Sequence, residues 1–451
     1  MGVVIQIGQL LLSLSILIIL HELGHFVFAR LFNTRVEKFY LFFDPWFSIF
    51  KLKRGDTEYG IGWLPLGGYV KISGMIDESM DREQLKQPPQ PWEFRSKPTG
   101  QRLLIMLGGV IVNLILGFII YSAVLFTWGE KYLPVKNLTD GIWCVDSIAT
   151  NIGFRNGDKI LSINNKEPQQ FEDIYREIIF GGTVKVLRNN QVDSFVVPTD
   201  FIGSLVKERN VMLFYPRVPF IFREIPDTSI NAASDLRPKD QVLSINGIPV
   251  KYYDQYLAVV DTIQPGKIVL KLLRDGKTLQ VDAVLSDKHK LEIFSIIPDF
   301  DELEKLNLYN LETRKYNIFS AIPAGAKLAG ERLAFYVRQF KLIFDFKTGA
   351  YKGLGGFGTI GGLFPKVWEW QAFWEITAFL SLILAFMNVL PIPALDGGHV
   401  AFLLYEMVTR RKPSEKFLEY AQIVGMVIIL GLLVFANTND IVRWVERLIH
   451  K

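Results

Sequence analysis

The stretch "LIILHELGHFVFARLF" (residues 17–32) places two histidines and a glutamate at the end of an apolar run. Polar and ionisable groups inside a lipid bilayer are costly, so their presence there indicates a functional site. Residues four apart on a helix lie about 40° from each other around the axis, so His21 and His25 face the same way. The chain has five histidines, and two of them fall in this pentapeptide. The pattern therefore predicts a site rather than two interfacial side chains at a helix end.

The composition limits the class of protein. The chain has 451 residues, of which 49% are hydrophobic and 21% are charged, which favours a membrane protein over a soluble enzyme. The net charge of +4 arises from 50 basic and 46 acidic side chains, too small an excess over this length to indicate nucleic-acid binding. The single cysteine, Cys144, excludes an intrachain disulfide and a cysteine-based metal cluster, and we expect it to be a small core residue.

Four uncharged stretches are long enough to cross a membrane, whose hydrocarbon core of ~30 Å takes ~20 helical residues. They are residues 3–20, 103–128, 376–395 and 420–439. The first is not expected to be a signal peptide, because "MGVV" lacks a basic region and "HELGH" stands where a small-residue cleavage site belongs. The sequence predicts an α-helical integral membrane protein with four transmembrane helices.

Basic residues predict the orientation of these helices. They are concentrated between residues 30 and 102 and in the loop after the third span, where Arg410, Arg411, Lys412 and Lys416 lie. Short loops rich in lysine and arginine face the cytoplasm. We therefore expect both termini and residues 129–375 to lie outside, and the "HELGH" end of the first span to lie near the cytoplasmic face.

The external segment contains an internal repeat. "GFRNGDKILSINNKEP" begins at residue 153 and "DLRPKDQVLSINGIPV" at residue 235, so that "LSIN" recurs with an offset of 82 residues. Each copy is followed by a pattern that predicts a β-hairpin. Alternating apolar residues flank a turn, which is Asn-Asn in the first copy and Asp-Gly in the second. The pattern resembles two small α+β PDZ domains. Neither copy has the glycine-rich "GLGF" carboxylate loop, which favours gating or partner docking over tight capture of peptide C-termini.

Two histidines leave a catalytic zinc ion one protein ligand short. Asp396 in "NVLPIPALDGGH" (residues 388–399) lies at the cytoplasmic end of the third apolar stretch, at a depth comparable to that of His21. We favour it as third ligand over His399, which follows two glycines. The same three ligands suit non-haem iron, but Glu22 supplies a base that hydrolysis needs and an oxygenase does not. The residues therefore favour a zinc hydrolase.

"HELGH" and "NVLPIPALDGGH" together resemble the site-2 protease family of intramembrane zinc metalloproteases, and the tandem PDZ-like insert resembles its RseP-type members. The resemblance covers nearly the whole chain. "GIGWLPLGGYVKISGMIDE" (residues 60–78) is similar to the family's membrane-dipping β-hairpin, whose edge pairs with substrate. "GFGTIGGL" (residues 356–363) departs from the family's "SGPV"-like form, so no role is transferred to it.

The resemblance implies roles for individual residues. Zn²⁺ is held by His21, His25 and Asp396, and Glu22 acts as general base on a zinc-activated water. The strand around Gly68, Tyr69 and Val70 offers backbone partners to an unwound substrate, and Asn388 and Pro393 contact substrate or shape the site. Asn388 suits a helix–helix hydrogen bond equally well. Asn113, midway along the second span, is expected to form such an interhelical bond.

The expected organisation has five parts: 1–129, a membrane core with the membrane-associated β-hairpin; 130–215 and 216–291, the PDZ-like domains; 292–371, an amphipathic helix and a glycine-rich connector; and 372–451, the third and fourth spans. The resemblance implies a protease of the bacterial inner membrane, with periplasmic PDZ-like domains. Its implied substrates are pre-trimmed single-span proteins, anti-sigma factors or remnant signal peptides. Its other partners are the bilayer and a periplasmic ligand of the PDZ-like domains. The alternatives are a non-catalytic membrane receptor or scaffold with peptide-binding PDZ domains, and a transporter with an ion site in the broken third helix.

Overall fold

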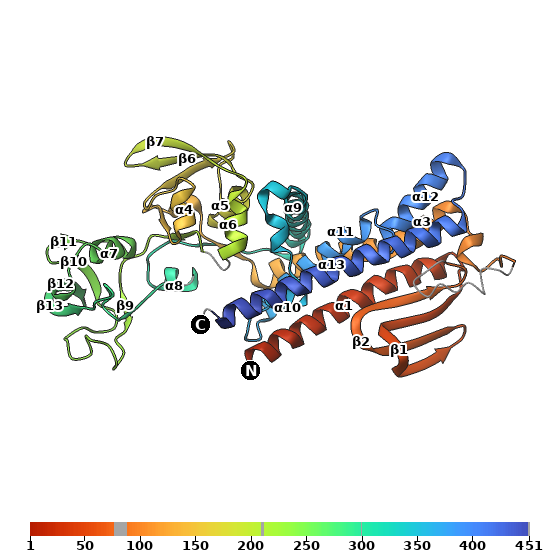
Figure 1. Cartoon of the computed structure of the whole chain (residues 1–451), viewed down its shortest axis with the longest axis horizontal. Coiled ribbons are helices and arrows are strands. Elements are labelled where there is room, and N and C mark those ends of the chain that lie inside the picture. The colour runs from red at the N-terminus through yellow and green to blue at the C-terminus, as the bar shows by residue number, and fades with distance from the viewer. Residues whose placement is uncertain (76–87, 209–211, 299, 450–451) are drawn as a thin grey trace. The chain divides into compact units, whose positions relative to one another are not determined.

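The computed structural model describes residues 1–75, 88–208, 212–298 and 300–449, and the chain forms two compact units (Figure 1). The membrane unit comprises Met1–Gly129, Lys315–Lys341 and Gly353–Lys451. The repeat unit comprises Glu130–Arg314 and Leu342–Lys352. The expected connector, 292–371, is thus divided between the two units: 292–314 and 342–352 belong to the repeat unit, and the rest belongs to the membrane unit.

Four helices of the membrane unit are long and apolar enough to cross a bilayer, which confirms the four expected spans. They are α1 (Gly2–Leu31), α3 (Thr99–Trp128), α11 (Trp370–Val389) and α13 (Glu415–Ile449). The third was expected to reach residue 395, but α11 ends at Val389 because Pro391 and Pro393 cannot donate the hydrogen bonds that would continue it. A separate helix, α12 (Asp396–Thr409), begins after a six-residue loop.

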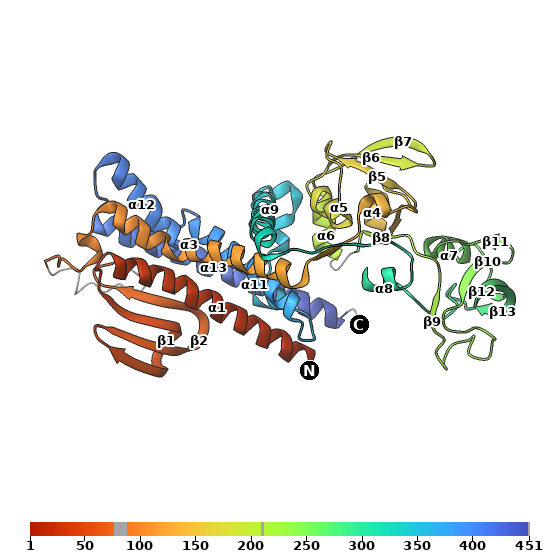
Figure 2. The ribbon, with the colours of Figure 1, turned by 180° about the vertical axis from the view of Figure 1, so that it is seen from behind.

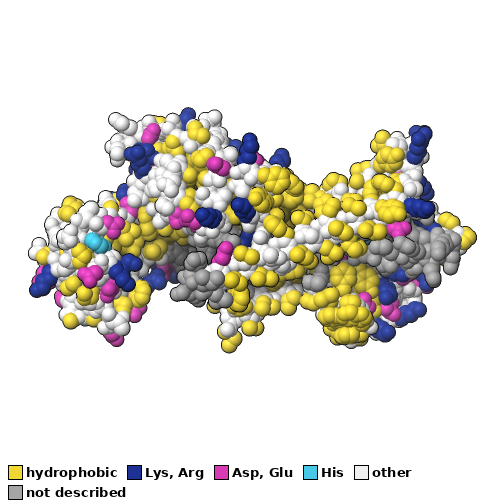
Figure 3. Space-filling view, viewed as in Figure 1, with side chains coloured by type: hydrophobic (Ala, Val, Ile, Leu, Met, Phe, Trp, Pro, Cys, Tyr) yellow, Lys and Arg dark blue, Asp and Glu magenta, His cyan; other side chains and the backbone are white. Residues whose placement is uncertain are grey.

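The helices of the membrane unit pack through small residues and turn apolar faces outward. A Cβ on Gly24 of α1 would lie 2.3 Å from the carbonyl oxygen of Gly108 on α3, so only glycine permits this backbone approach. On the outer faces, Val4 of α1 and Val434 of α13 are 69% and 65% exposed. Hydrophobic side chains run along these helices in the space-filling view (Figure 3). A surface of this kind is expected where a protein faces lipid.

A β-hairpin lies beside α1 in both ribbon views (Figures 1 and 2). It consists of β1 (Val36–Arg54) and β2 (Thr57–Ile72), and both strands bend, so their pairing produces four antiparallel segments. Their order is 64–72, 36–43, 57–62 and 48–54. Within the described residues, segment 64–72 pairs only with segment 36–43 and is therefore an edge. Residues 76–78 of the hairpin stretch named above lie outside the described residues.

The expected amphipathic helix is α9 (Ile318–Phe344). Its small residues Ala321, Gly325 and Ala329 are buried, and a Cβ on Gly325 would lie 2.3 Å from Oγ of Ser122 on α3. The short helix α10 (Phe357–Gly361) follows in the glycine-rich stretch, and the Asp440 carboxylate of α13 accepts hydrogen bonds from the backbone N–H groups of Gly356 and Thr359 at its start.

The repeat unit contains two copies of one small sheet-and-helix arrangement. The first copy has β5 (Lys159–Ile163), β6 (Gly182–Arg188) and β7 (Gln191–Val197) with helix α5 (Phe171–Ile178). The second has the order β11-β10-β12-β13, that is Ile248–Pro249, Gln241–Ile245, Gly266–Arg274 and Lys277–Leu285, with helix α7 (Tyr253–Val260). Each copy has its own hydrophobic cluster.

Short elements complete the repeat unit. Three two-stranded pairs are β3 (Glu130–Tyr132) with β15 (Glu312–Arg314), β4 (Ile142–Cys144) with β8 (Phe214–Pro216), and β9 (Phe222–Glu224) with β14 (Phe294–Ser295). The short helices are α4 (Ser147–Asn151), α6 (Phe201–Glu208) and α8 (Phe300–Lys305). Leu303 and Tyr309 belong to the hydrophobic cluster of the first copy, so residues beyond 291 contribute to its core.

The residues that recur with the offset of 82 perform the same structural task in both copies. Asp158 is buried and accepts two hydrogen bonds of 2.8 Å from Arg188 at the end of β6. Asp240 is buried likewise and accepts two of 2.7 Å from Arg274 at the end of β12. The repeated motif is therefore a folding element. Cys144 is a buried free thiol, as expected, and burial raises its pKa to about 12.

Candidate metal centre

Three side chains in the membrane unit bring one ligand atom each to a common point. Nε2 of His21 lies 3.2 Å from Oδ2 of Asp396, Nε2 of His25 lies 3.3 Å from the same oxygen, and the two Nε2 atoms are 3.3 Å apart. Among the described residues this is the single group of three or more histidine, cysteine or acidic side chains with metal-ligand spacing. The group contains Asp396, the favoured third residue, and not its competitor His399.

The geometry and chemistry of this triangle fit a zinc ion. A tetrahedral ion with bonds of 2.0–2.1 Å places neighbouring ligand atoms about 3.3–3.4 Å apart. Oδ2 of Asp396 is buried and accepts no hydrogen bond from the described residues, although two imidazole nitrogens lie beside it. A cation at the centre would satisfy the carboxylate and both imidazoles together. Two histidines and one carboxylate also leave a fourth tetrahedral position open.

The α1–α3 contact sets the position of both imidazoles. A Cβ on Gly109 of α3 would lie 2.5 Å from Nε2 of His25 and 2.5 Å from Cε1 of His21, so the rings occupy the space that this glycine leaves empty. Nδ1 of His25 lies 2.8 Å from the backbone carbonyl oxygen of Ile105. A carbonyl can only accept, so His25 carries its proton on Nδ1 and directs Nε2 to the cluster.

Two asparagines contact His21. Nδ2 of Asn388 on α11 lies 3.3 Å from Nε2, and Nδ2 of Asn113 on α3 lies 3.1 Å from Nδ1. Asn113 was expected to join two helices, and it does so through the side chain of His21. Its contact with the site was not predicted, although the spacing of four residues from Gly109, which places both on one face of α3, is a signal that the sequence contains.

A loop rather than a span positions Asp396, which is the first residue of α12. In the preceding loop, Ala394 has a φ of +78°, a conformation that costs a non-glycine residue roughly 1–2 kcal/mol. Its backbone N–H donates a hydrogen bond of 3.2 Å to Oε1 of Gln422 on α13. A Cβ on Gly425, one turn further along α13, would lie 1.6 Å from the carbonyl oxygen of Pro393, so the helix and the loop are in close contact.

An ion pair joins α12 to α3. Nη2 of Arg102 donates a hydrogen bond of 2.6 Å to Oε1 of Glu406, and both side chains are buried. Thr99 donates a further hydrogen bond of 3.1 Å to the same oxygen. The helix that begins with Asp396 is thus attached to the helix that carries Gly109. No local sequence pattern indicates this pair, because its partners are 304 residues apart.

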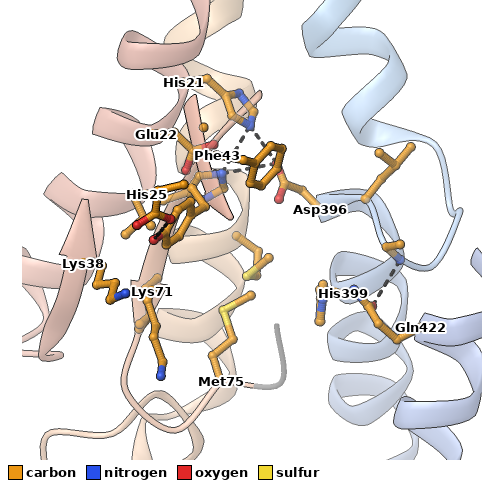
Figure 4. Close-up of a pocket in the computed structure, with 18 of the residues that line it drawn as sticks. His21, Glu22, His25, Lys38, Phe43, Lys71, Met75, Asp396, His399 and Gln422 are labelled. Atoms are coloured by element: carbon orange, nitrogen blue, oxygen red, sulfur yellow. Dashed lines mark hydrogen bonds and ion pairs between the residues drawn. The ribbon is translucent and has the colours of Figure 1, made fainter. Parts of the chain in front are cut away.

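The triangle opens onto a cavity of about 710 Å³ (Figure 4). Glu22, Gly68, Tyr69 and Val70 line this cavity together with the three candidate ligands. Its wall also includes His399 and Gln422. A Cβ on Gly68 would lie 2.6 Å from Cγ2 of Ile18 and 2.8 Å from the Tyr40 carbonyl oxygen, so this glycine lets the edge strand approach α1 beside Glu22. Asn388 and Pro393 are not among the lining residues.

Comparison with known proteins decides the family. Residues 9–432 match the model of peptidase family M50. The chain belongs to this family. It is therefore a zinc-dependent membrane metalloprotease of the site-2 type, which confirms the family, the enzyme class and the cofactor expected from the sequence.

The curated relatives are similar over almost their whole length. A protein named as a zinc metalloprotease from Rickettsia conorii is 27% identical over 441 residues, which cover 96% of this chain and 97% of the relative. A regulator of sigma E protease from Haemophilus influenzae is 25% identical over 468 residues, which cover 97% and 99% of the two chains. The matched lengths therefore include most of both units of this chain.

Proposed function

We propose that this member of family M50 cleaves transmembrane segments inside the bilayer, with His21, His25 and Asp396 as zinc ligands and Glu22 as general base. The observation that carries the proposal is the triangle of ligand atoms with edges of 3.2, 3.3 and 3.3 Å, which includes an oxygen that accepts no hydrogen bond from the part of the chain that the structure describes. Zinc bound there supplies a Lewis acid that polarises a peptide carbonyl and lowers the pKa of water.

Glu22 supplies the proton transfers. It lines the same cavity as the three ligands and follows His21 directly in the chain, so its carboxylate is within the site and outside the triangle (Figure 4). During attack on the peptide carbonyl it takes the proton of the nucleophilic water. It then delivers that proton to the leaving amine, because the same group serves as base and acid in turn.

The hairpin edge and Asn388 hold the substrate. A helical substrate must unwind before cleavage, because its carbonyls are engaged in backbone hydrogen bonds. Segment 64–72 is the edge of the hairpin, and Gly68, Tyr69 and Val70 line the cavity, so strand addition there would give the unwound backbone new partners. Asn388 does not line the cavity, but its Nδ2 lies 3.3 Å from Nε2 of His21, and its amide N–H₂ would donate to a substrate carbonyl that reaches this atom.

The substrates we propose are single-span proteins that another protease has already trimmed, such as anti-sigma factors or remnant signal peptides. The regulator of sigma E protease among the relatives supports the first of these. The two sheet-and-helix copies of the repeat unit would be PDZ-like domains in the periplasm that obstruct bulky ectodomains. The cleavage site would then lie near the cytoplasmic face of the inner membrane, consistent with the basic residues that follow α1.

The decisive experiment compares wild type with Glu22→Gln in membranes, on a single-span substrate with a short ectodomain. The substitution preserves size and leaves the three ligands in place, so we expect cleavage to fall by at least about 100-fold, the lower range of a general base's contribution. Zinc content, measured in parallel by atomic spectroscopy, should be unchanged.

Equal cleavage by both forms would refute the assignment of Glu22. His21→Ala tests the ligand set separately: we expect it to lose zinc and activity together, and retention of zinc would refute that set. Attaching a folded ectodomain to the same span should slow cleavage by wild type, and equal rates for both substrates would refute the gating role of the repeat unit.

A further inference from the structure

Asn113 has an arrangement that the proposed mechanism leaves unexplained. Its side chain is fully buried midway along α3, and its Oδ1 has no hydrogen-bond partner among the described residues. Its Nδ2 lies 3.1 Å from Nδ1 of His21. A buried amide costs stability unless both ends are satisfied, so a position of this kind calls for a specific reason.

With Nδ2 turned toward the ring, the Asn113 amide conflicts with metal binding by His21. An N–H₂ group can only donate, so Nδ1 of His21 would have to accept and the ring proton would sit on Nε2, although the Asn388 N–H₂ group, another donor, faces that atom at 3.3 Å. Nε2 is the atom that lies 3.2 Å from Oδ2 of Asp396 and 3.3 Å from Nε2 of His25. A ring protonated there has no lone pair for a metal ion.

His25 shows how the neighbouring ring avoids this conflict. Its Nδ1 lies 2.8 Å from the backbone carbonyl oxygen of Ile105, which fixes the proton on Nδ1 and leaves Nε2 available. Ile105 and Asn113 are both on α3, eight residues apart, with Gly109 midway between them. One helix therefore presents a polar atom to the Nδ1 of each imidazole.

The oxygen and nitrogen of an amide have almost the same shape, so a half-turn about the Cβ–Cγ bond exchanges them without moving any neighbour. After this exchange, Oδ1 faces Nδ1 of His21 and accepts its proton. Oδ1 then gains a partner, Nδ2 takes the position that has none among the described residues, and Nε2 no longer carries the ring proton. The backbone of Asn113 is also tied to α11, because Oγ of Ser381 donates a hydrogen bond of 2.7 Å to the backbone oxygen of Asn113. This bond helps to keep Asn113 beside His21.

We propose that Asn113 is a positioning residue for His21: its carbonyl oxygen accepts the Nδ1 proton and thereby fixes the ring in the tautomer that binds metal through Nε2. This inference rests on the proposed assignment of His21 as a zinc ligand. Partners of this kind orient metal-bound histidines and raise their basicity, and their loss typically lowers metal affinity 10–100-fold.

The test measures zinc affinity of the full-length protein in detergent, by competition with a chromophoric chelator. Asn113→Leu has nearly the same volume and no acceptor, and we expect it to bind zinc 10–100-fold more weakly. Asn113→Asp retains an acceptor at the same place, so its affinity should remain within about threefold of wild type or exceed it. Thr377→Val is the matched control, because Thr377 is buried, bonds to Ser13 of α1 and is not one of the three candidate ligands.

The rival explanation is that Asn113 only joins helices. In that case Asn113→Leu and the smaller Asn113→Ala would lower the unfolding temperature of the zinc-free protein and leave the zinc affinity of the folded fraction unchanged, which would overturn the proposal. A weak Asn113→Asp, as poor as the leucine variant, would overturn it too. Retention of zinc by His21→Ala refutes the ligand set instead, so the two failures are distinguishable.

Discussion

The candidate metal centre has two halves that are built in opposite ways. His21 and His25 lie on the regular helix α1, packed against α3 at a contact where Gly24 and Gly108 bring the two backbones together. Asp396 follows a loop that begins where two prolines interrupt the third span and that includes a left-handed alanine. The first half depends on helix periodicity, and the second depends on what surrounds a break in a helix.

This difference has energetic consequences. A regular helix satisfies its own backbone groups, so α1 needs only a close-fitting partner to place its side chains. Backbone without such bonds is tolerated at membrane depth only where protein buries it or a water-filled cavity solvates it. The loop before Asp396 accordingly relies on contacts from two other helices, Gln422 and Gly425 on α13 and the Arg102–Glu406 pair between α3 and α12.

Gly109→Ala should have the largest effect, because it adds a methyl group to the half of the site in which α1 and α3 pack closely. The added methyl group would lie 2.5 Å from Nε2 of His25 and 2.7 Å from Nδ1 of His21, and moving α3 away to relieve the overlap would break the close Gly24–Gly108 packing. We expect zinc affinity to fall by more than about 100-fold, beyond the range of losing a single supporting hydrogen bond. Chelator competition on the purified protein measures it.

Gly100→Ala is the matched control on the same helix, since a Cβ at Gly100 meets nothing within 4 Å. It should leave zinc affinity unchanged and raise helix stability slightly, by up to about 1 kcal/mol. If Gly109→Ala binds zinc as well as wild type does, Gly109 does not hold the two imidazoles in place. The positions of His21 and His25 would then not depend on close packing between α1 and α3.

Glu406→Gln should have an intermediate effect, because it loosens the link between the two halves. Removing one charge of a buried pair leaves Arg102 unpaired, which typically costs 3–5 kcal/mol. We expect a marked drop in the unfolding temperature. Because Glu406 and Asp396 share α12, we also expect zinc affinity to fall about tenfold, the lower end for supporting contacts.

Thr99→Val separates the two consequences of this change. Thr99 also bonds to Glu406, but it carries no charge, so its loss should cost about 1 kcal/mol and leave zinc bound. A Glu406→Gln protein that unfolds more easily and yet binds zinc with full affinity would show that Asp396 is positioned by its loop alone.

The two halves also differ in how far the sequence reveals them. The i, i+4 spacing of His21 and His25 and the apolar run before them carry the first half, and the two imidazoles lie side by side as that spacing predicts. Asp396 was named because a carboxylate at membrane depth needs a partner. The end of its span was placed six residues too late, since hydropathy does not register that two prolines end a helix before the apolar residues end.

Contacts between distant parts of the chain could not be predicted from the sequence. Gln422 and the Arg102–Glu406 pair have no local pattern, because each depends on which helices become neighbours. Asn113 was noticed and connected with another helix, but not with the metal site. In the repeat unit, the two copies and their hairpins could be predicted from the sequence. The contribution of Leu303 and Tyr309 to the core of the first copy could not, because these residues lie far along the chain from that copy.

Gln422→Met should have the smallest effect, because it removes one of several supports of the loop half. Methionine has similar length and cannot accept the backbone N–H of Ala394, whose φ of +78° then loses its stabilising bond. The loss of about 1 kcal/mol for one hydrogen bond corresponds to a zinc affinity about fivefold weaker, if all of it is expressed at Asp396.

Asn437→Leu is the control, since Asn437 lies on α13 too but accepts a bond from Phe357, far along the helix. An unchanged affinity in Gln422→Met would mean that the contact at Gly425 holds the loop unaided. A loss as large as that of Gly109→Ala would mean that both halves are equally dependent on single contacts, and the contrast between them would not hold.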